Sequence, residues 1–553
     1  MSNCMSYFRS YWPKYWWQTL IVVTSVSGIC LGICGFRDLN GEISLSDGLY
    51  DTFRLFLLNH QFEGAIGLKL DISRWLIFFT FLFITFKLFI TIVAPAFFQQ
   101  QLIHRTKDHI ILCGLNETSL GFIRKCPPNP LVIIAAEKNQ YTESLKQRKI
   151  HFITGDPSDP HILNIANLQH ATSLYALTEN DTHNLNIAHN AFSLLKQHKS
   201  TRQKPLKCYT SISDLELKNL LNDSALFKYT ATDNEKFFFD GILFNTDEAG
   251  IKFSICKNIP HILPDVNRKK LCLLIIGLND KAENILLSLA HCLTMGRTSL
   301  HFTIIEKDTG KINAFREKYP FMEDFIDLSF ASDIPAQTDF SSIFVCRNNS
   351  LESVKKAVFL RYRLGQNYPA IFTFCHKPEN VFTLLNLPGK DFEPLDKRNI
   401  HLINTFDEAF EYVIRLNDTI EKMAEQAHHL WRKDEKDDYK LLSEHFKQSN
   451  RNQVLDYYIK TYLWKGKTYE ALRSQQIPLS ITAYDQETLA MMEHRRWMIE
   501  KYLNKWQYGD QRDDYFKRRP NLKLWDDNLS SEDKEKDYKT IELMLQNLNI
   551  QNL

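Results

Sequence analysis

The segment His109-Ile110-Ile111-Leu112-Cys113-Gly114 decides the fold of most of this chain. An uncharged, mostly apolar run that ends in glycine is typical of a strand buried on both faces of a sheet and followed by a tight turn. Similar runs follow at 131–137, 151–156 and 173–178, and helix-like segments separate them. Strands that alternate with helices in this way predict a parallel, doubly wound α/β sheet.

Three further motifs add a family resemblance to this pattern. They are Gly155-Asp156-Pro157, the segment 163–171 and the segment Thr178-Glu179-Asn180-Asp181-Thr182-His183-Asn184-Leu185. With them, residues 108–262 resemble the regulator-of-potassium-conductance (RCK) family, whose domains are also called KTN or TrkA-N domains. The resemblance implies a Rossmann-like domain that forms dimers and gating rings and holds ligands at the carboxyl ends of its strands.

The turn after the first strand is where this fold binds phosphates, and here its sequence is unusual. A G-x-G-x-x-G motif lets a pyrophosphate approach the backbone, but Asn116 and Ser119 replace its second and third glycines. Because those glycines are missing, a structural role in dimerisation is the favoured alternative to nucleotide binding. The candidate nucleotide site consists of Gly114, Asn116, Glu137 and Asp156.

A second, more diverged copy of this domain is predicted at residues 265–410. Its first strand, Leu271–Asn279, matches Ile110–Asn116 in pattern, and Gly277, Asn279 and Glu306 stand at its fingerprint positions. By analogy with the family, two such units per chain would let four chains form an eight-unit ring. The predicted strands of this copy are 271–279, 301–306, 342–346 and 371–375.

Residues 411–553 have a helical pattern that is rich in tryptophan, tyrosine and charge. Ser449-Asn450-Arg451 is followed by Glu493-His494-Arg495-Arg496-Trp497, by Trp506-Gln507-Tyr508-Gly509, by Arg512-Asp513 and by a Pro520–Trp525 run. This order of motifs resembles the repeat domain of ryanodine receptors (RyR) in its bacterial form. The resemblance implies an all-α, RyR-like domain at 411–553, although the family usually has His-Pro where this chain has Arg519-Pro520.

These motifs combine side chains that suit an anionic ligand. Glu493, Arg496 and Trp497 share one helix face, because they are three and four residues apart. A guanidinium group binds phosphate, and an indole ring stacks on a base. The alternative is a small core in which tryptophans pack and Glu–Arg pairs orient helices. The candidate ligand-binding residues are Ser449, Asn450, Arg451, Glu493, Arg496, Trp497, Trp506, Tyr508 and Arg512.

Residues 1–107 contain the long apolar runs of the chain. Tyr15–Phe36 has no charged residue, and about 22 residues at about 1.5 Å each cross the hydrocarbon core of a bilayer. Trp75–Phe98 is a second predicted span, with Lys87 as its only charge. Basic residues flank both spans and the loop between them is acidic. The pattern predicts a multi-pass protein of the cell inner membrane with both termini in the cytoplasm.

The loop between the two spans contains a short helix-like segment. Ser46 and Asp47 have the pattern of an N-cap, and Leu49–Leu58 has mostly helical spacing. This segment fits a re-entrant helix, so the layout resembles the pore module of potassium channels. The family's T-V-G-Y-G filter is absent, and potassium selectivity is not carried over. The candidate pore residues are Asn59, His60, Gln61, Glu63 and Lys87, with a helix or headgroup contact as the alternative for Lys87.

Composition excludes several classes of function. The formal net charge is +2 over 553 residues, so no basic field indicates nucleic-acid binding. The eleven cysteines show neither a C-x-x-C pair nor metal-site spacing with histidine, so we expect reduced thiols and no metal. We find no paired acid and base or nucleophile constellation. A nicotinamide enzyme is therefore the weakest hypothesis, and we expect a protein that is not an enzyme.

The leading hypothesis is a homotetrameric, ligand-gated ion channel that contacts membrane lipid. Its cytoplasmic RCK and RyR regions would sense a small nucleotide-like ligand, such as an ADP-ribose-like molecule, a cyclic nucleotide or an adenine nucleotide. In a bacterium, such a channel would act as a stress or antiviral effector that dissipates ion gradients. The alternative is a non-conducting, membrane-anchored sensor that regulates a partner ion transporter.

Overall fold

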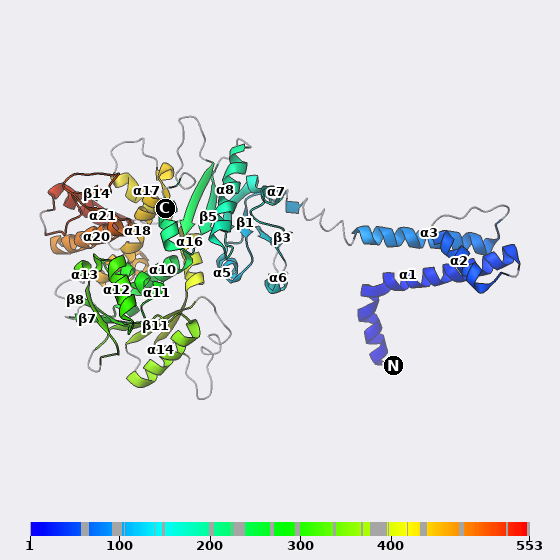
Figure 1. Ribbon diagram of the computed structural model, residues 1–553, viewed down its shortest axis with the longest axis horizontal. Coiled ribbons are helices and arrows are strands. Elements are labelled where there is room, and N and C mark those ends of the chain that lie inside the picture. Colours follow the sequence, from blue (N-terminus) through cyan, green and yellow to red (C-terminus); the bar gives the residue numbers. More distant parts are fainter. Residues whose placement is uncertain are drawn as a thin grey trace. The chain divides into compact units, whose positions relative to one another are not determined.

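A computed structural model divides the chain into two compact units, Met1–Arg105 and Thr106–Leu553 (Figure 1). Each unit has its own internal packing and is taken separately below. The structure describes residues 2–41, 43–56, 66–90, 102–103, 105–137, 139–145, 150–197, 204–222, 224, 238–265, 270–292, 299–335, 339–365, 369–375, 395, 397–416, 419–431, 439–474, 480–526 and 529–549.

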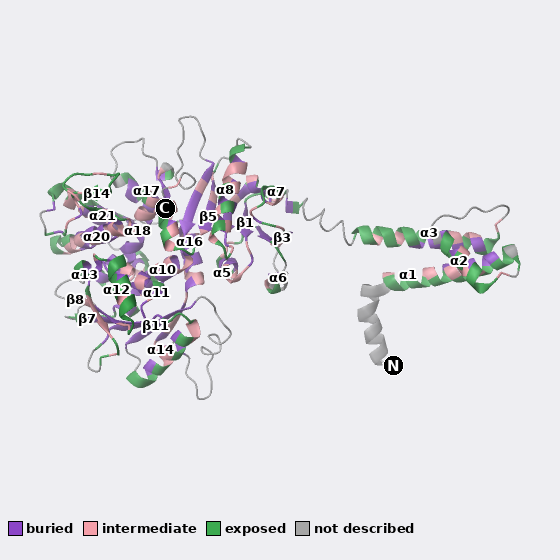
Figure 2. Ribbon diagram, in the orientation of Figure 1, coloured by how far each residue is buried: buried purple, intermediate pink, exposed green. Residues whose placement is uncertain are grey.

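The main helices of the N-terminal unit are α1 (Ser2–Asn40), α2 (Leu45–Phe56) and α3 (Leu68–Leu88). α1 packs against both other helices. Its segment Trp17–Leu39 is the one stretch of the described residues that is long and apolar enough to cross a membrane. Exposed apolar side chains line α1 and α3 (Figure 2). α3 also carries four charged residues: Lys69, Asp71, Arg74 and Lys87.

Glycines on α1 let the other helices approach its backbone closely. Gly28, Gly32 and Gly35 share one face at spacings of four and three residues, a small-residue pattern that brings helices together in membranes. A Cβ atom at Gly35 would lie 2.9 Å from the backbone nitrogen of Leu70. Ser73 Oγ donates to the Gly28 carbonyl oxygen over 2.7 Å and ties α3 to α1.

Replacing Gly35 by valine should therefore destabilise the N-terminal unit by about 1–3 kcal/mol, the usual cost of overpacking. The new side chain meets backbone atoms of Leu70, which cannot rotate away. The measurement is the temperature at which the detergent-solubilised chain leaves its size-exclusion peak. Gly48→Ala is the matched control, because a Cβ there would lie 3.5 Å from its nearest neighbour. Equal losses in both variants would contradict the prediction.

The short helix α2 begins earlier than its sequence pattern predicts. The Asp47 backbone N–H donates to Ser44 Oγ over 3.2 Å, and the Ser44 hydroxyl donates to Asp47 Oδ2 over 2.7 Å. Ser44, rather than Ser46 or Asp47, is thus the N-cap. The reason is that a serine N-cap and an acid three residues later satisfy each other's hydrogen bonds.

Lys87 lies level with one end of the apolar segment of α1. Its ammonium nitrogen is 5.3 Å from the ring centre of Trp17, the first residue of that segment. This placement favours a contact with the neighbouring helix over a position at mid-span. The candidate pore residues Asn59, His60, Gln61 and Glu63, and residues 91–98 of the second predicted span, lie outside the described residues.

The first sheet of the second unit starts at residue 109 and is parallel throughout. Its order is β3-β2-β1-β4-β5-β6, which reverses between β1 and β4 as in Rossmann folds. The strands are β1 (His109–Cys113), β2 (Leu131–Ala135), β3 (Ile150–Thr154), β4 (Ala171–Ala176), β5 (Leu206–Ser211) and β6 (Phe239–Phe244). Its helices are α5 (Glu117–Lys125), α6 (Gln140–Leu145), α7 (Pro160–Ile165), the 3-10 turn η2 (Leu168–His170), α8 (Asp181–Gln197), α9 (Leu215–Leu221) and α10 (Thr246–Ile262).

The second sheet repeats this topology. Its order, β12-β11-β10-β7-β8-β9, is that of the first sheet read from its other end, and its neighbouring strands are also parallel. The strands are β7 (Lys270–Ile276), β8 (Ser299–Ile305), β9 (Asp327–Ala331), β10 (Ser342–Val345), β11 (Ala370–Cys375) and β12 (Ile400–Asn404). The helices are α11 (Asp280–Leu289), α12 (Thr309–Lys318), α13 (Met322–Phe325), α14 (Ser350–Leu364) and α16 (Thr405–Leu416). The two predicted Rossmann-like sheets are confirmed.

Helices α10 and α16 hold the two sheets together. Each follows the last strand of its own sheet, and the two helices pack against each other. α10 also contacts α11, the first helix of the second sheet, while α16 contacts α5, the first helix of the first sheet. The crossing is close because a Cβ at Gly250 would lie 2.2 Å from the Thr405 carbonyl oxygen. The ion pair of Arg124 and Asp407, at 2.6 Å, joins α5 to α16.

The C-terminal region is helical apart from two short strands. Its helices are α17 (Thr419–Trp431), the 3-10 turn η3 (Tyr439–Leu441), α18 (Glu444–Lys465), α19 (Tyr469–Ser474), α20 (Ala483–Leu503) and α21 (Ser531–Asn549), with β13 (Gln507–Tyr508) and β14 (Arg518–Arg519) between the last two helices. The two strands depart from the all-α prediction. α18 packs on α10 and β6, so this region shares one hydrophobic core with both sheets.

Candidate functional site

Helices α18, α20 and α21 surround a pocket of about 340 Å³, called the C-terminal pocket below. Six of the nine predicted ligand-binding residues lie together in its wall: Ser449, Asn450, Glu493, Arg496, Trp497 and Arg512. The two motifs that sequence analysis singled out, on α18 and on α20, therefore face one cavity. The other lining residues are His428, Leu442, Phe446, Gln453, His494, Lys501, Arg519, Asn521, Asp533, Lys536 and Asp537.

Two predicted ligand-binding residues lie beside the pocket rather than in its wall. Tyr508 is exposed, and its hydroxyl donates to Asp510 over 2.7 Å. Trp506 lies against Arg519, whose guanidinium carbon is 4.6 Å from the ring centre. Since Arg519 does line the pocket, Trp506 acts on the site by positioning that guanidinium.

Arg451 is fully buried, which corrects its assignment as a ligand contact. Its Nε donates to Glu421 over 2.7 Å, and its Nη1 donates to Glu444. A guanidinium held by two carboxylates inside the protein is a structural group. In the sequence, Arg451 looks the same as a surface arginine, because burial is set by how α17 packs on α18.

Glu493 and Arg496 form the inner wall of the pocket and are bound to each other. Arg496 donates to Glu493 over 2.8 Å and to Glu500 over 2.7 Å, and Lys460 Nζ donates to Glu493 over 2.8 Å. Burial alone would raise the pKa of Glu493, but the charges of Arg496 and Lys460 outweigh it and lower that pKa. The carboxylate is ionised and satisfied by the protein itself.

The remaining charge of the pocket is positive. Five basic and three acidic side chains line it, and Lys536 pairs with Asp533 over 2.8 Å. Within the described part of the chain, Arg519 Nε is buried and has no hydrogen-bond partner. Burial, with the charge of Arg512, lowers the pKa of Arg519. A buried cationic donor without an acceptor is costly, so an anion in this pocket would lower the free energy of the site.

His494 and Asp537 form a hydrogen bond in the pocket wall. His494 Nε2 lies 2.8 Å from the Lys523 carbonyl oxygen, which only accepts, so Nε2 donates. His494 Nδ1 lies 3.0 Å from Asp537 Oδ2, within hydrogen-bonding distance. Burial raises the pKa of Asp537 to about 6, and the hydrogen bond and charge of His494 act against that rise.

The raised pKa of Asp537 predicts a specific pH dependence of stability. The folded pKa lies above the ordinary value of 3.8, so the neutral carboxyl is favoured by folding and its contribution is lost as pH rises from about 4 through about 6. Relative to Asp537→Asn, which stays neutral, the wild-type chain should lose about 3 kcal/mol over that window. Thermal midpoints of both proteins from pH 4 to 7 provide the measurement. A wild-type advantage that grows with pH would contradict the prediction.

Several pocket residues were not predicted from sequence, although some carry a readable signal. Lys501 lies four residues after Trp497, on the same face of α20. Asp533 and Asp537 have the same spacing on α21. Nothing in the sequence places α21 opposite α20, so its side chains could not be joined to the site. That neighbourhood comes from the packing of α20 on α21.

At the predicted nucleotide site of the first sheet, the protein's own side chains occupy the phosphate turn. Asn116 Oδ1 accepts from the Ser119 N–H over 2.9 Å and caps α5, while Asn116 Nδ2 donates to the Leu177 carbonyl oxygen over 2.7 Å. Gly114 has a φ of +99° and sits against Leu177. Glu137 is exposed at the end of β2. Asp156 Oδ1 lies 2.8 Å from His183 Nε2.

The matching turn of the second sheet borders a cavity of about 550 Å³. Gly277, Asn279 and Glu306 line it, together with basic residues of α12 and α14. Glu306 accepts backbone N–H groups of Leu278, Lys307 and Asp308 at 2.9–3.3 Å. Its carboxylate therefore binds the loops of this sheet in the present structure. Asn279 caps α11 in the same way that Asn116 caps α5.

Two segments of the chain match known domains. Residues 110–223 match the TrkA-N domain, and residues 474–552 match the RyR domain. The predicted TrkA-N and RyR resemblances are confirmed over these ranges. No curated protein matches the chain by sequence.

Solved structures with some likeness to this chain include GsuK and the human SLO3 gating ring. The crystal structure of GsuK bound to ADP has 15% identity and a TM-score of 0.35, and the match covers 74% of this chain and 99% of that chain. The GsuK channel bound to NAD has 13% identity and a TM-score of 0.35, covering 73% and 83%. The human SLO3 gating ring has 10% identity and a TM-score of 0.37, covering 56% and 84%.

Proposed function

We propose that this chain is a ligand-gated ion channel of the cell inner membrane. Four copies form the pore, and the C-terminal pocket binds a small, anionic, nucleotide-derived ligand without transforming it. The observation that carries the proposal is the unpaired, buried Arg519 donor in a pocket with surplus positive charge. The apolar segment Trp17–Leu39 supports the membrane location, and the TrkA-N and RyR domains support a regulatory, ligand-sensing role.

The pocket offers separate groups for the parts of a nucleotide. Arg512 and Arg519 suit a phosphate, since guanidinium groups bind phosphate oxygens with two parallel hydrogen bonds. Trp497, stacked on His494 at 5.7 Å between ring centres, suits a base or a ribose face. A volume of about 340 Å³ is at the small end of ligand pockets. An ADP-ribose-like molecule, a cyclic nucleotide and an adenine nucleotide are the proposed candidates.

Planar-bilayer recording of the purified full-length chain tests the proposal. ADP-ribose, cyclic AMP and ADP are applied from the cytoplasmic side, and we expect one of them to open a conductance. Arg519→Ala should raise the half-activating concentration at least about tenfold, because a charge-assisted hydrogen bond contributes about 1.5–3 kcal/mol. Arg518→Ala is the matched control, since Arg518 is exposed and lies outside the pocket wall.

Two results would overturn the channel proposal. One is a silent bilayer with every nucleotide while calorimetry on the same protein detects binding. The other is a stable monomer in detergent, because two helices per chain cannot enclose a pore. The full-length chain is used because the helical region shares its core with both sheets, so residues 411–553 alone would expose a large apolar surface.

The alternative function is a non-conducting, membrane-anchored sensor that regulates a partner ion transporter. The contact of Lys87 with Trp17 favours it, because this lysine then has a packing role instead of a pore role. The same bilayer experiment separates the two functions. Binding without conductance, restored by adding a co-purified transporter, would favour the sensor.

A further inference from the structure

A second cavity, of about 120 Å³, adjoins the C-terminal pocket and is called the inner cavity below. It lies where three parts of the second unit meet: α10 from the first sheet, α11 from the second sheet, and α18 with α20 from the helical region. Arg496 lines both this inner cavity and the C-terminal pocket, and among the described lining residues no other side chain does so. A displacement of the Arg496 side chain therefore changes the wall of both cavities.

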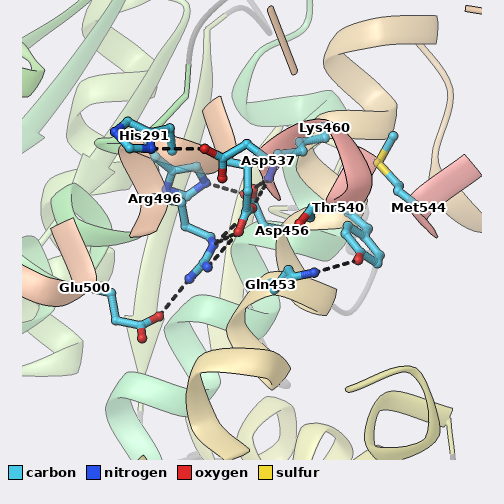
Figure 3. A network of polar contacts seen from close by, with 12 residues as sticks. His291, Gln453, Asp456, Lys460, Arg496, Glu500, Asp537, Thr540 and Met544 are labelled. Atoms are coloured by element: carbon cyan, nitrogen blue, oxygen red, sulfur yellow. Dashed lines mark hydrogen bonds and ion pairs between the residues drawn. The ribbon is translucent and has the colours of Figure 1, made fainter. Parts of the chain in front are cut away.

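Arg496 connects the ligand pocket to the sheets through a buried polar network (Figure 3). On one side, Arg496 binds Glu493, which accepts from Lys460; Lys460 pairs with Asp456, and Asp456 with His291 just after α11. Burial, with the charges of Lys460 and Arg496, lowers the pKa of His291 well below its ordinary value. The imidazole is thus neutral, and it adds no charge to the network.

On the other side, Arg496 binds Glu500. Burial would raise the pKa of Glu500, but the charges of Arg496 and Lys501 and a hydrogen bond from Ser449 outweigh it and lower that pKa to about 2. Glu500 Oε2 accepts from Arg496 Nη1 over 2.7 Å. Glu500 Oε1 is buried and has no hydrogen-bond partner within the described part of the chain. Lys252 of α10 lines the same inner cavity, and its Nζ donates to Asn452 over 2.6 Å, a neutral partner. Burial lowers the pKa of Lys252, and the charges of Glu248 and Glu500 oppose that change.

We propose that an anionic ligand triggers an exchange of ion-pair partners inside this network. The ligand draws the Arg496 guanidinium away from Glu500, and Glu500 then pairs with Lys252 across the inner cavity. This inference rests on the proposed function and adds to it the route by which pocket occupancy reaches α10. A buried carboxylate that loses its cation is strongly destabilised unless another cation replaces it. The charge of Lys501 also acts on Glu500, but among the described residues that line the inner cavity Lys252 is the one lysine or arginine besides Arg496, and its hydrogen-bond partner is the neutral Asn452.

The exchange displaces α10 at its contact with α16, where the two helices join the two sheets. α10 carries both Lys252 and Gly250, and Gly250 is the point where α10 touches the start of α16. Pulling Lys252 toward Glu500 moves α10 relative to α16. A ligand changes a conformational equilibrium only through contacts that differ between the two states, and this exchange is such a contact.

Isothermal titration of the full-length, detergent-solubilised chain with ADP-ribose tests the exchange in a double-mutant cycle. Lys252→Met removes the new partner of Glu500, so binding should weaken about tenfold. Glu500→Gln removes the need for that partner, so binding should be at least as tight as in wild type. In the Glu500→Gln background, Lys252→Met should change affinity less than about twofold.

Hydrogen exchange of residues 246–262 provides a second measurement if Lys252→Met folds poorly. ADP-ribose should change the exchange of this helix in the wild-type chain and leave it unchanged in Glu500→Gln. Equal losses of affinity from Lys252→Met in both backgrounds, or no ligand effect on this helix in wild type, would overturn the exchange while leaving the pocket intact. No binding of ADP-ribose would also overturn it, whereas nucleotide binding by the C-terminal pocket is contradicted only if every nucleotide of the panel fails to bind.

Discussion

Replacing Arg451 by alanine should remove about 3–5 kcal/mol from the stability of the Thr106–Leu553 unit, enough to leave much of the chain unfolded. Arg451 has no exposed surface, and its guanidinium holds Glu421 of α17 and Glu444 of α18. Without it, both carboxylates lose the cation that they bind directly, and the charges of Lys447 and Lys207 offset their burial only in part. The cost comes from those two unpaired groups more than from the lost arginine.

The pKa values around Arg451 refine this expectation. Burial raises the pKa of Glu444 to about 7 even with Arg451 beside it. For Glu421, burial also acts upward, but the charge and hydrogen bonds of Arg451 outweigh it and lower the pKa. In the alanine variant both acids should therefore bind protons more readily. The destabilisation should shrink as pH falls from 8 to 5, because proton binding neutralises the buried charges.

Thermal midpoints of the detergent-solubilised chain measure the effect. Arg451→Met tests whether charge or volume matters, and it should be nearly as damaging as alanine. Adding Glu421→Gln and Glu444→Gln to Arg451→Met should restore much of the stability, because neither position then carries a buried carboxylate without its arginine. A variant that keeps its midpoint but no longer responds to nucleotide would instead make Arg451 a ligand contact.

Gly250→Ala should be strongly damaging to the second unit, although it adds only one methyl group. The added Cβ would lie 2.2 Å from the Thr405 carbonyl oxygen and 2.9 Å from its carbonyl carbon. Both atoms are backbone, so the start of α16 must move away from α10. Overpacking of this kind costs about 1–3 kcal/mol and occasionally more, and here it opens the crossing that joins the two sheets.

The expected readouts are a lower thermal midpoint and faster proteolysis between the two sheets. Gly67→Ala is the control, because nothing lies within 4 Å of a Cβ there. Gly121→Ala provides an intermediate case, since its Cβ would lie 3.1 Å from the Cβ of Phe406 on α16. The order of damage should be Gly250, then Gly121, then Gly67. An unchanged thermal midpoint in Gly250→Ala would show that α10 and α16 can move apart at little cost. It would also weaken the proposal that α10 transmits ligand binding to the sheets.

In the two six-stranded sheets, sequence analysis missed four strands: β5, which lies inside the first sheet, and three edge strands, β6, β9 and β12. The three edge strands have a common explanation. β9 and β12 lie at the two edges of the second sheet, and β9 is largely half-buried or exposed. An edge strand has one neighbouring strand and is more exposed to solvent, so its sequence mixes polar and apolar residues. Asp327–Ala331 has no continuous apolar run. β6, also an edge strand, contains Asp240, which pairs with Lys447 of α18 over 2.8 Å.

The central strands and the two phosphate turns could be read from the sequence because their causes are local. β1 is buried along its whole length and β7 is buried after Lys270, so both strands are mostly apolar. Gly114 and Gly277 have φ values of +99° and +98°, a conformation that other residues rarely adopt. The shared face of Glu493, Arg496 and Trp497 follows from helical spacing alone.

The sequence by itself thus determined the class of fold, the internal repeat, the apolar N-terminal segment and two of the motifs that line the pocket. Those features depend on periodicity, glycine conformations and residues that are close along one element. Only the tertiary structure decided which arginines are available to bind a ligand. Arg451 and Arg519 have the same side chain, but one is held by two buried carboxylates and the other keeps a buried donor without a partner. The physical reason is that burial and ion pairing arise where α17, α18, α20 and α21 meet, and contacts between segments so distant in the chain leave no local pattern.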